Sequence, residues 1–95
     1  MHVISRKKLK EAVLGHGDLE GPLDAWFRIV KKASWHNLSD VRKTLASADL
    51  VGKWTVFNIK GNHYRLITEI NYGFGRIYVR HVLTHAEYDR GDWEQ

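Results

Sequence analysis

The sequence predicts an α+β fold, in which an N-terminal short strand and two helices pack on a C-terminal antiparallel sheet. Residues 6–34 carry apolar side chains at the spacing of amphipathic helices. From Lys53 onwards the period changes to two, in three runs rich in β-branched and aromatic residues that are separated by glycine-containing turns. Helices followed by strands are typical of the α+β class. A chain of 95 residues is expected to form a single domain, residues 1–95.

The N-terminal third is expected to contain the short strand and both helices. The strand precedes Ser5, a good N-cap for a helix over Arg6–Leu14 that two glycines end. A second helix begins near Asp18 or Pro22, because proline is tolerated in a first turn, and continues to Ser34. Its apolar stripe consists of Leu19, Leu23, Trp26, Phe27, Val30 and Ala33.

The middle of the chain predicts a connector, and the last third predicts the sheet. Residues 37–48 are polar, with one short helical turn that Ser39 can cap. Gly61-Asn62 is a hairpin signal, and a second turn contains Gly73 and Gly75. Residues 86–92 are expected either to form a short helix or to fray. The predicted strands are Trp54–Lys60, Asn62–Tyr72 and Arg76–Leu83.

Composition restricts the classes of function. There is no cysteine, which excludes disulfides and thiolate metal sites. No apolar run is long enough to cross a membrane and the N-terminus lacks a signal-peptide pattern, so a cytoplasmic protein without a membrane partner is expected. The formal net charge is +4, and between Lys53 and His85 five Lys or Arg residues stand against the single acid Glu69. This local excess favours an anionic partner such as RNA.

Strand alternation predicts which side chains face away from the helices. In the third strand Leu83 and His81 fall on the core side, His81 as a buried neutral side chain, whereas Val82 faces away. A solvated outer face is the ordinary alternative, but such faces usually mix charges. The side chains expected to converge on an open basic face are Asn58, Lys60, His63, Arg65, Tyr78 and Arg80.

The residue types permit metal-free cleavage of RNA. His81 and His85 have a zinc-like spacing, but they span a strand end and lack a third ligand, so no metal and no cofactor is expected. RNA supplies its own nucleophile, the 2′-OH. An enzyme must orient it, move protons and stabilise the charged phosphorane. Arginine suits the charge because its fork binds two phosphate oxygens, and histidine suits proton transfer because it titrates near neutrality.

Three blocks of sequence resemble the HigB toxins of the RelE-like superfamily of type II toxin–antitoxin systems. They read His-Val-Ile-Ser-x-Lys-x-Leu-Lys-Glu-Ala over His2–Ala12, Val-Phe-Asn-Ile-Lys-Gly-Asn-x-Tyr-Arg-Leu over Val56–Leu66, and Ile-Tyr-Val-Arg-His-Val-Leu-Thr-His-x-Glu-Tyr-Asp over Ile77–Asp89. The blocks follow in order over nearly the whole chain. The resemblance implies a ribosome-dependent endoribonuclease, an mRNA interferase that cleaves mRNA during translation and arrests growth.

The resemblance also implies partners and residue roles. The partners are mRNA on the ribosome and a HigA-like helix-turn-helix antitoxin, with promoter DNA bound only through the toxin–antitoxin complex. Arg65 matches the phosphate-binding arginine, and Lys60 falls near the lysines of the preceding strand. His85 lies where other members have an arginine or a histidine that acts as general acid, and Tyr88 matches a tyrosine near the cut site. Arg80 has no such counterpart.

Two other readings remain open at the level of sequence. One is a non-catalytic RNA- or ribosome-binding module, in which the basic face remains but Arg65 and His85 are dispensable for toxicity. The other is a small structural protein whose basic face binds an acidic protein. Tyr88 and His85 also have structural alternatives, as a packing anchor and a turn cap respectively.

Overall fold

A mixed sheet forms the centre of the molecule, with the strand order β1-β5-β4-β3-β2 within residues 1–94, which the computed structural model describes. β1 runs parallel to β5, and the other neighbours are antiparallel. The predicted α+β class is confirmed. The elements along the chain are β1 (His2–Ile4), α1 (Arg6–Gly15), η1 (Gly17–Leu19), α2 (Glu20–Lys32), α3 (Leu38–Thr44), β2 (Asp49–Val51), β3 (Trp54–Ile59), β4 (Tyr64–Asn71), β5 (Arg76–Thr84), α4 (His85–Arg90) and η2 (Asp92–Glu94).

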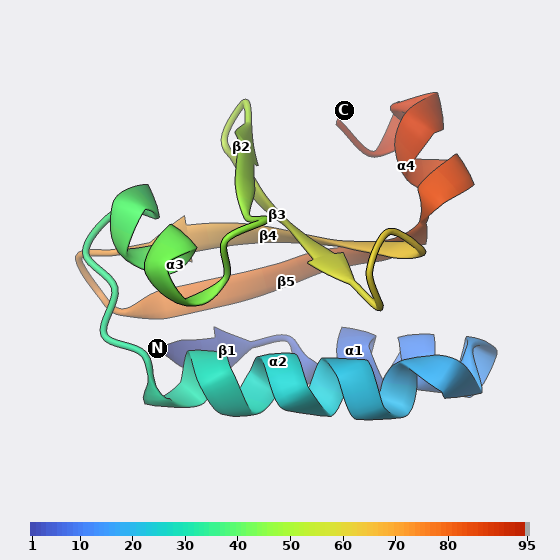
Figure 1. The fold of residues 1–95 in the computed structure, drawn as a ribbon, viewed down its shortest axis with the longest axis horizontal. Helices are drawn as coiled ribbons and strands as arrows, with labels where there is room; N and C mark the ends of the chain where they lie inside the picture. The colour runs from blue at the N-terminus through green and yellow to red at the C-terminus, as the bar shows by residue number, and fades with distance from the viewer. Residues whose placement is uncertain (95) are drawn as a thin grey trace.

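The sheet lies between two unequal layers, seen nearly edge-on in Figure 1. α1 and α2 lie along one face, and α4 lies on the other side. The apolar stripe of α2 buries Trp26 and Val30, and the Trp26 ring meets Phe57 of β3 edge-on at 5.5 Å between centroids. The main core therefore fills the space between the helices and the sheet. We call the opposite side of the sheet the outer face.

The three long strands agree with prediction apart from their ends, but β2 was missed. It has only three residues, too few to show alternation, and Leu50 at its centre is exposed. It exists because Gly52, with φ of 61°, folds the chain back so that Val51 pairs with Trp54. The parallel pairing of β1 with β5 also lay beyond prediction, because it depends on where both helices pack.

The predicted N-cap of α1 is confirmed in position but not in its hydrogen bond, and the predicted cap of α3 is wrong. Ser5 makes no capping hydrogen bond with its side chain and has a left-handed φ of 70°, because the chain turns there directly from β1 into α1. α3 is capped by Asn37, whose Oδ1 accepts from the Asp40 backbone N–H at 2.9 Å, and Ser39 lies inside the helix. Residues 86–92, for which two outcomes were open, mostly belong to α4, and a capping box of Thr84 and Glu87 begins this helix.

A β-bulge changes the facing of the last strand. Ile67 and Thr68 are consecutive on β4, but their partners on β5 are His81 and Val79. Arg80 is therefore an extra residue that opposes no single partner. Beyond it, every side chain of β5 faces the side opposite to the one that strict alternation predicts.

The bulge overturns three predictions. Val82 packs against the main core, and Leu83 packs on the outer face, the reverse of the expected arrangement. His81 lies opposite Ile67 on the outer-face side and is only partly buried. Its pKa is lowered, mainly by desolvation and then by the positive charges of Lys8 and Arg80.

Candidate active site

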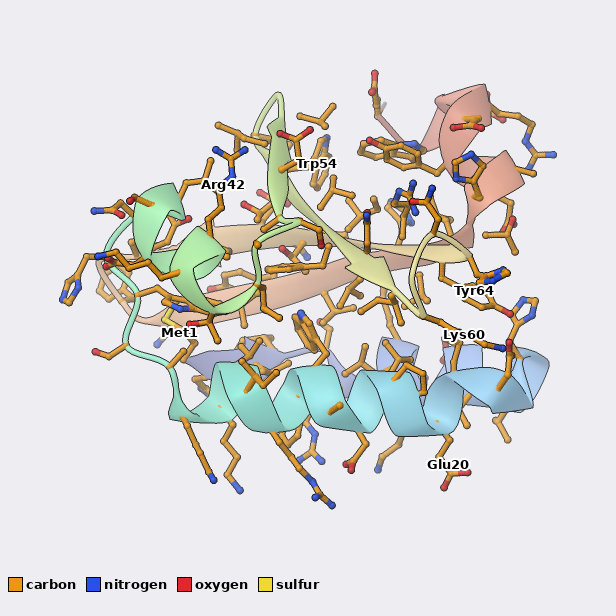
Figure 2. The ribbon with its side chains drawn as sticks, in the orientation of Figure 1. Met1, Glu20, Arg42, Trp54, Lys60 and Tyr64 are labelled. Atoms are coloured by element: carbon orange, nitrogen blue, oxygen red, sulfur yellow. The ribbon has the colours of Figure 1, made fainter. Side chains whose placement is uncertain are left out.

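The outer face is not the open basic surface that alternation predicted. The C-terminal segment folds back over it and forms a second apolar cluster. The rings of Trp54 and Trp93 meet there at 6.3 Å, and Figure 2 shows Trp54 on this side of the sheet. The cluster buries Val56, Ile67 and Trp93, with Val51, Trp54, Leu83 and Tyr88 partly buried around them.

Arg65 is a buried cation beside this cluster. It lies on β4, across from Asn58 of β3, and only 8% of the residue is exposed. Its Nη1 donates to the carbonyl oxygens of Asn62 and Tyr64, both at 3.2 Å. Its Nη2 donates to Asn62 Oδ1 at 2.9 Å and approaches His85 Nδ1 at 3.2 Å.

No carboxylate neutralises Arg65 within residues 1–94: every ion pair of this part of the chain involves other cations. The guanidinium carbon instead lies 5.3 Å from the centre of the Tyr88 ring. A buried charge held by neutral acceptors attracts an external anion, because that anion would supply the missing countercharge. Arg65 is thus the strongest candidate for an anion-binding group on the outer face.

His85 begins α4, which follows directly from β5. Its backbone N–H donates to the His63 carbonyl at 3.0 Å, which fixes the start of the helix against the β3–β4 turn. Its ring is half exposed and contacts Arg65 through Nδ1 and Asp89 Oδ2 through Nε2, the latter at 3.0 Å. The imidazole therefore lies between the buried cation and an exposed carboxylate.

Tyr88 lies one helical turn after His85 and is held by Trp93. The two rings stack at 5.1 Å with 17° between their planes, and Trp93 Nε1 donates to the Tyr88 carbonyl at 2.9 Å. Tyr88 thus has the packing contacts of an anchor, and its ring also lies beside Arg65. The structure brings together the three residues proposed as catalytic, Arg65, His85 and Tyr88.

The sequence analysis did not identify three residues that contact Arg65, His85 or Tyr88. Asn62 holds the Arg65 guanidinium through both its backbone and its side-chain oxygen. Asp89 contacts His85 from the next turn of α4, and Trp93 stacks on Tyr88. The four-residue spacing of His85 and Asp89 is a recognisable signal once residues 85–90 are helical. Nothing in the sequence indicates the return of Trp93 to the sheet.

Of the four residues proposed to contact RNA, two lie near Arg65. Asn58 is exposed on the outer face directly across from it. His63 is exposed in the β3–β4 turn, and its carbonyl accepts from the His85 backbone. Both residues are therefore exposed near Arg65.

Lys60 does not face the same way, so its predicted convergence with Asn58 is wrong. β3 ends at Ile59, and Lys60 has a left-handed φ of 52°, which turns it out of the strand alternation. Its Nζ donates to Asp18 Oδ2 at 2.8 Å, and the Tyr64 hydroxyl donates to the same carboxylate. Figure 2 shows Lys60 and Tyr64 together at this end of the sheet. The hydrogen bond between Lys60 and Asp18 lowers the pKa of the Asp18 carboxyl, and the same hydrogen bond raises the pKa of the Lys60 amine.

Arg80 lies on the outer face but is already paired. Its Nε donates to Glu69 Oε1 at 2.8 Å, and its guanidinium carbon lies 5.1 Å from the centre of the Tyr78 ring. Glu69, which stood alone in the sequence, therefore neutralises a cation of the same face. The local excess of positive charge on the outer face is smaller than the sequence suggested, and it is centred on Arg65.

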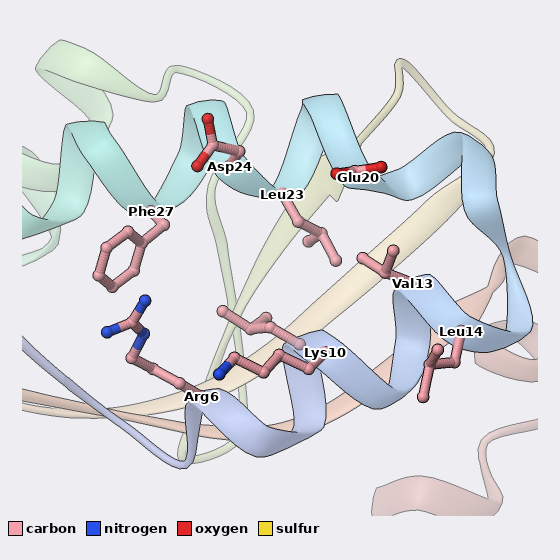
Figure 3. A pocket seen from close by; sticks show the side chains of 9 residues that line it. Arg6, Lys10, Val13, Leu14, Glu20, Leu23, Asp24 and Phe27 are labelled. Atoms are coloured by element: carbon pink, nitrogen blue, oxygen red, sulfur yellow. The ribbon is translucent and has the colours of Figure 1, made fainter.

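The helix side carries a groove of a different kind, shown in Figure 3. It lies between α1 and α2, with a volume of about 560 Å³ and a mostly apolar lining that includes Val13, Leu23 and Phe27. Charges of both signs flank it: Arg6, over the Phe27 ring at 4.2 Å, on α1 and Asp24 on α2. This groove does not suit a phosphate, because its cations are matched by acids. The group of Arg65, His85 and Tyr88 on the outer face is the better candidate for a site that acts on nucleic acid.

No helix within residues 1–94 is long and apolar enough to cross a membrane.

The fold and the cluster define a class: a small α+β protein in which helix α4 presents a histidine and a tyrosine beside a buried arginine of the sheet. Residues 19–91 match the family model for HigB toxins, described as the RelE-like toxic component of a toxin–antitoxin system. The chain therefore belongs to the HigB toxin family, as the three sequence blocks indicated. Membership in a toxin–antitoxin family implies an antitoxin partner.

Similar proteins extend this likeness over nearly the whole chain. An mRNA interferase HigB of Escherichia coli O6:H1 is 29% identical over 93 residues, which cover 95% of this chain and 90% of the relative. The mRNA interferase toxin HigB of Escherichia coli K12 is 29% identical over 92 residues, 94% of this chain and 88% of the relative. An mRNA interferase HigB of Shigella flexneri shows the same identity and coverage.

Proposed function

We propose that this protein is the toxin of a toxin–antitoxin pair and acts as a metal-independent endoribonuclease that cleaves mRNA on the ribosome. The observation that carries the proposal is Arg65, a buried cation without a carboxylate partner in residues 1–94, beside an imidazole and a phenol. The similarity to proteins named mRNA interferases supports the choice of mRNA as substrate.

The proposed reaction uses the nucleophile of the substrate. The 2′-oxygen attacks the adjacent phosphorus to form a 2′,3′-cyclic phosphate and its proton passes to solvent water, the bond from phosphorus to the 5′-oxygen breaks, and that oxygen gains a proton. Arg65 stabilises the charge on the non-bridging oxygens, which is greatest in the transition state. His85 donates the proton to the leaving 5′-oxygen as general acid. Tyr88 positions the nucleotide at the cut by contact with its ring.

RNA affinity would come from exposed polar residues beside Arg65. Asn58 and His63 are exposed beside Arg65 and are proposed to contact the RNA backbone. Lys60 and Arg80 would contribute less, because each is already paired with a carboxylate. The ribosome is proposed to present the mRNA, since one small face offers few contacts of its own. The proposed partner is a helix-turn-helix antitoxin that binds promoter DNA together with the toxin, in the cytoplasm.

The test compares binding and cleavage in the same variants. His85→Ala should arrest the cleavage of mRNA in single-turnover assays on programmed ribosomes while ribosome binding persists, because a proton donor acts mainly in the transition state. His36→Ala is a matched control, since His36 is another exposed histidine with an aspartate four residues later, Asp40, at 3.3 Å. Wild-type cleavage by His85→Ala would exclude its catalytic role. Ribosome binding by wild-type protein without any cleavage would favour a non-catalytic binding module.

A further inference from the structure

The hydrogen bonds of His85 define which ring nitrogen carries a proton. The Arg65 guanidinium can only donate, so the Nδ1 it contacts at 3.2 Å must present a lone pair. The ionised Asp89 carboxylate can only accept, so the Nε2 it contacts at 3.0 Å must carry hydrogen. Both contacts are satisfied by one form of the ring, the neutral Nε2–H tautomer. An imidazolium would place Nδ1–H against the Arg65 cation.

The same bonds connect His85 to the binding of phosphate. Arg65 uses its two Nη1 contacts for the carbonyls of Asn62 and Tyr64. Its two Nη2 contacts go to Asn62 Oδ1 and His85 Nδ1. The terminal N–H groups of the fork are therefore all engaged, and a phosphate that binds it must replace some of these acceptors. A charged phosphate oxygen is a stronger acceptor than the two neutral side-chain acceptors of Nη2, Asn62 Oδ1 and His85 Nδ1, and it replaces them. His85 Nδ1 is then free to contact the phosphate.

We propose that Asp89 is a positioning residue. Its carboxylate accepts the hydrogen bond from Nε2–H and so holds the His85 ring in place while Nδ1 exchanges Arg65 for the RNA phosphate as its partner. With Nδ1 released, the ring can take up a proton there, and the Asp89 carboxylate stabilises the resulting imidazolium. The proton on Nδ1 then faces the scissile phosphate. The charged groups that contact the ring are Arg65 from β4 and Asp89 from α4, and the β3–β4 turn contacts the backbone of His85 through the neutral His63 carbonyl.

The inference rests on the proposed function for its catalytic part, but its structural part can be tested without RNA. Nitrogen-15 NMR of the imidazole rings distinguishes protonated from unprotonated nitrogens, and the loss of one set of signals in His85→Gln assigns His85. In the wild-type protein we expect a single tautomer with hydrogen on Nε2. Asp89→Ala should shift the Nε2–H signal, because this N–H loses its acceptor, while the Arg65 contact keeps the lone pair on Nδ1. Asp89→Asn should restore the wild-type pattern, since its amide oxygen still accepts from Nε2.

Cleavage provides the second measurement. Asp89→Ala should slow single-turnover cleavage by about twofold to fivefold, within the range for loss of one partly exposed ion-pair contact, with unchanged ribosome affinity. Asp89→Asn should recover part of this loss. Asp92→Ala is the control, because Asp92 is an exposed carboxylate of the same segment whose ion pair, at 4.0 Å, is with Arg90.

The outcomes separate the two proposals. An Nδ1–H tautomer in the wild-type protein, or wild-type signals in Asp89→Ala, would overturn the positioning role whatever the activity. Wild-type cleavage by Asp89→Ala would do the same. If no cleavage is found in any variant but the Nε2–H signal shifts in Asp89→Ala as expected, the proposed function fails and the placement of His85 by Asp89 stands.

Discussion

Replacing Arg65 with lysine should remove nearly all cleavage while the protein remains folded. Lysine keeps the charge but presents three donors from one point, whereas the guanidinium makes four contacts in a plane and can hold two phosphate oxygens at once. Loss of one donor that acts on the transition state typically costs about 10²–10³ in rate, or about 3–4 kcal/mol. We therefore expect cleavage by Arg65→Lys to fall by about 10²–10³ and by Arg65→Ala somewhat further.

The cost to folding should be smaller. Arg65→Ala leaves three oxygens without their donor, but Asn62 is exposed, so water replaces the guanidinium at its two oxygens. The carbonyl of Tyr64, a buried residue, loses its bond to Arg65, which costs about 1–3 kcal/mol. A domain of ordinary stability, about 5–15 kcal/mol, remains folded after such a loss.

The assay is single-turnover cleavage on programmed ribosomes with saturating enzyme, beside a thermal melt of each variant. Lys31→Ala is a suitable control, because Lys31 is an exposed cation on α2, away from the outer face. A wild-type cleavage rate in a folded Arg65→Lys would refute the reasoning that the fork stabilises the transition state. A loss of cleavage that follows only the loss of folded protein would refute it as well.

Three further predictions concern the site, the hairpin and the partner. Trp93→Ala should lower the free energy of unfolding by about 3 kcal/mol and reduce cleavage, because the buried ring covers the second cluster and stacks on Tyr88; unchanged denaturant unfolding would contradict this. Asp18 has a folded pKa lowered mainly by its hydrogen bond from Lys60, so its contribution to stability is present above its ordinary value of 3.8 and is lost as pH falls through the lowered folded value. The difference in unfolding free energy between wild-type protein and Asp18→Asn should therefore be present near neutral pH and vanish in strong acid; a constant difference over a pH series would argue against the linkage. A neighbouring helix-turn-helix protein should co-purify with this chain, raise its melting temperature and restore growth when co-expressed; failure in all three would count against it as the antitoxin.

Much of the candidate site could be predicted because it lies within short sequence blocks. Arg65 faces outward by simple alternation in β4, and the hairpin that precedes it was indicated by Gly61. His85 and Tyr88 were selected by their place in a C-terminal block, with α4 as one of two expected outcomes. The structure adds that these residues lie together, whereas their roles in chemistry stay predictions.

The remaining errors arise where one residue changes the direction of all that follow. Arg80 is a single extra residue in β5, and it reverses the facing of Val82 and Leu83 without any mark in the hydrophobic pattern. Lys60 departs from alternation because its backbone is left-handed, although lysine has no special preference for that conformation. Alternation is an average property of a strand, and it carries no information about such local departures.

Local sequence patterns were enough to predict the periodic elements, their order and the residue types that suit a phosphate. The elements can be predicted because burial of one face of each helix or strand requires apolar residues at a regular spacing along the chain. Three features depend on packing of the whole chain: β1 closes the sheet beside β5, Trp93 covers the outer face, and Glu69 and Asp18 neutralise two of the expected cations. Each of these is a contact between groups far apart in the chain or on neighbouring strands. Such contacts exist only when the whole chain has packed, so no local pattern selects them.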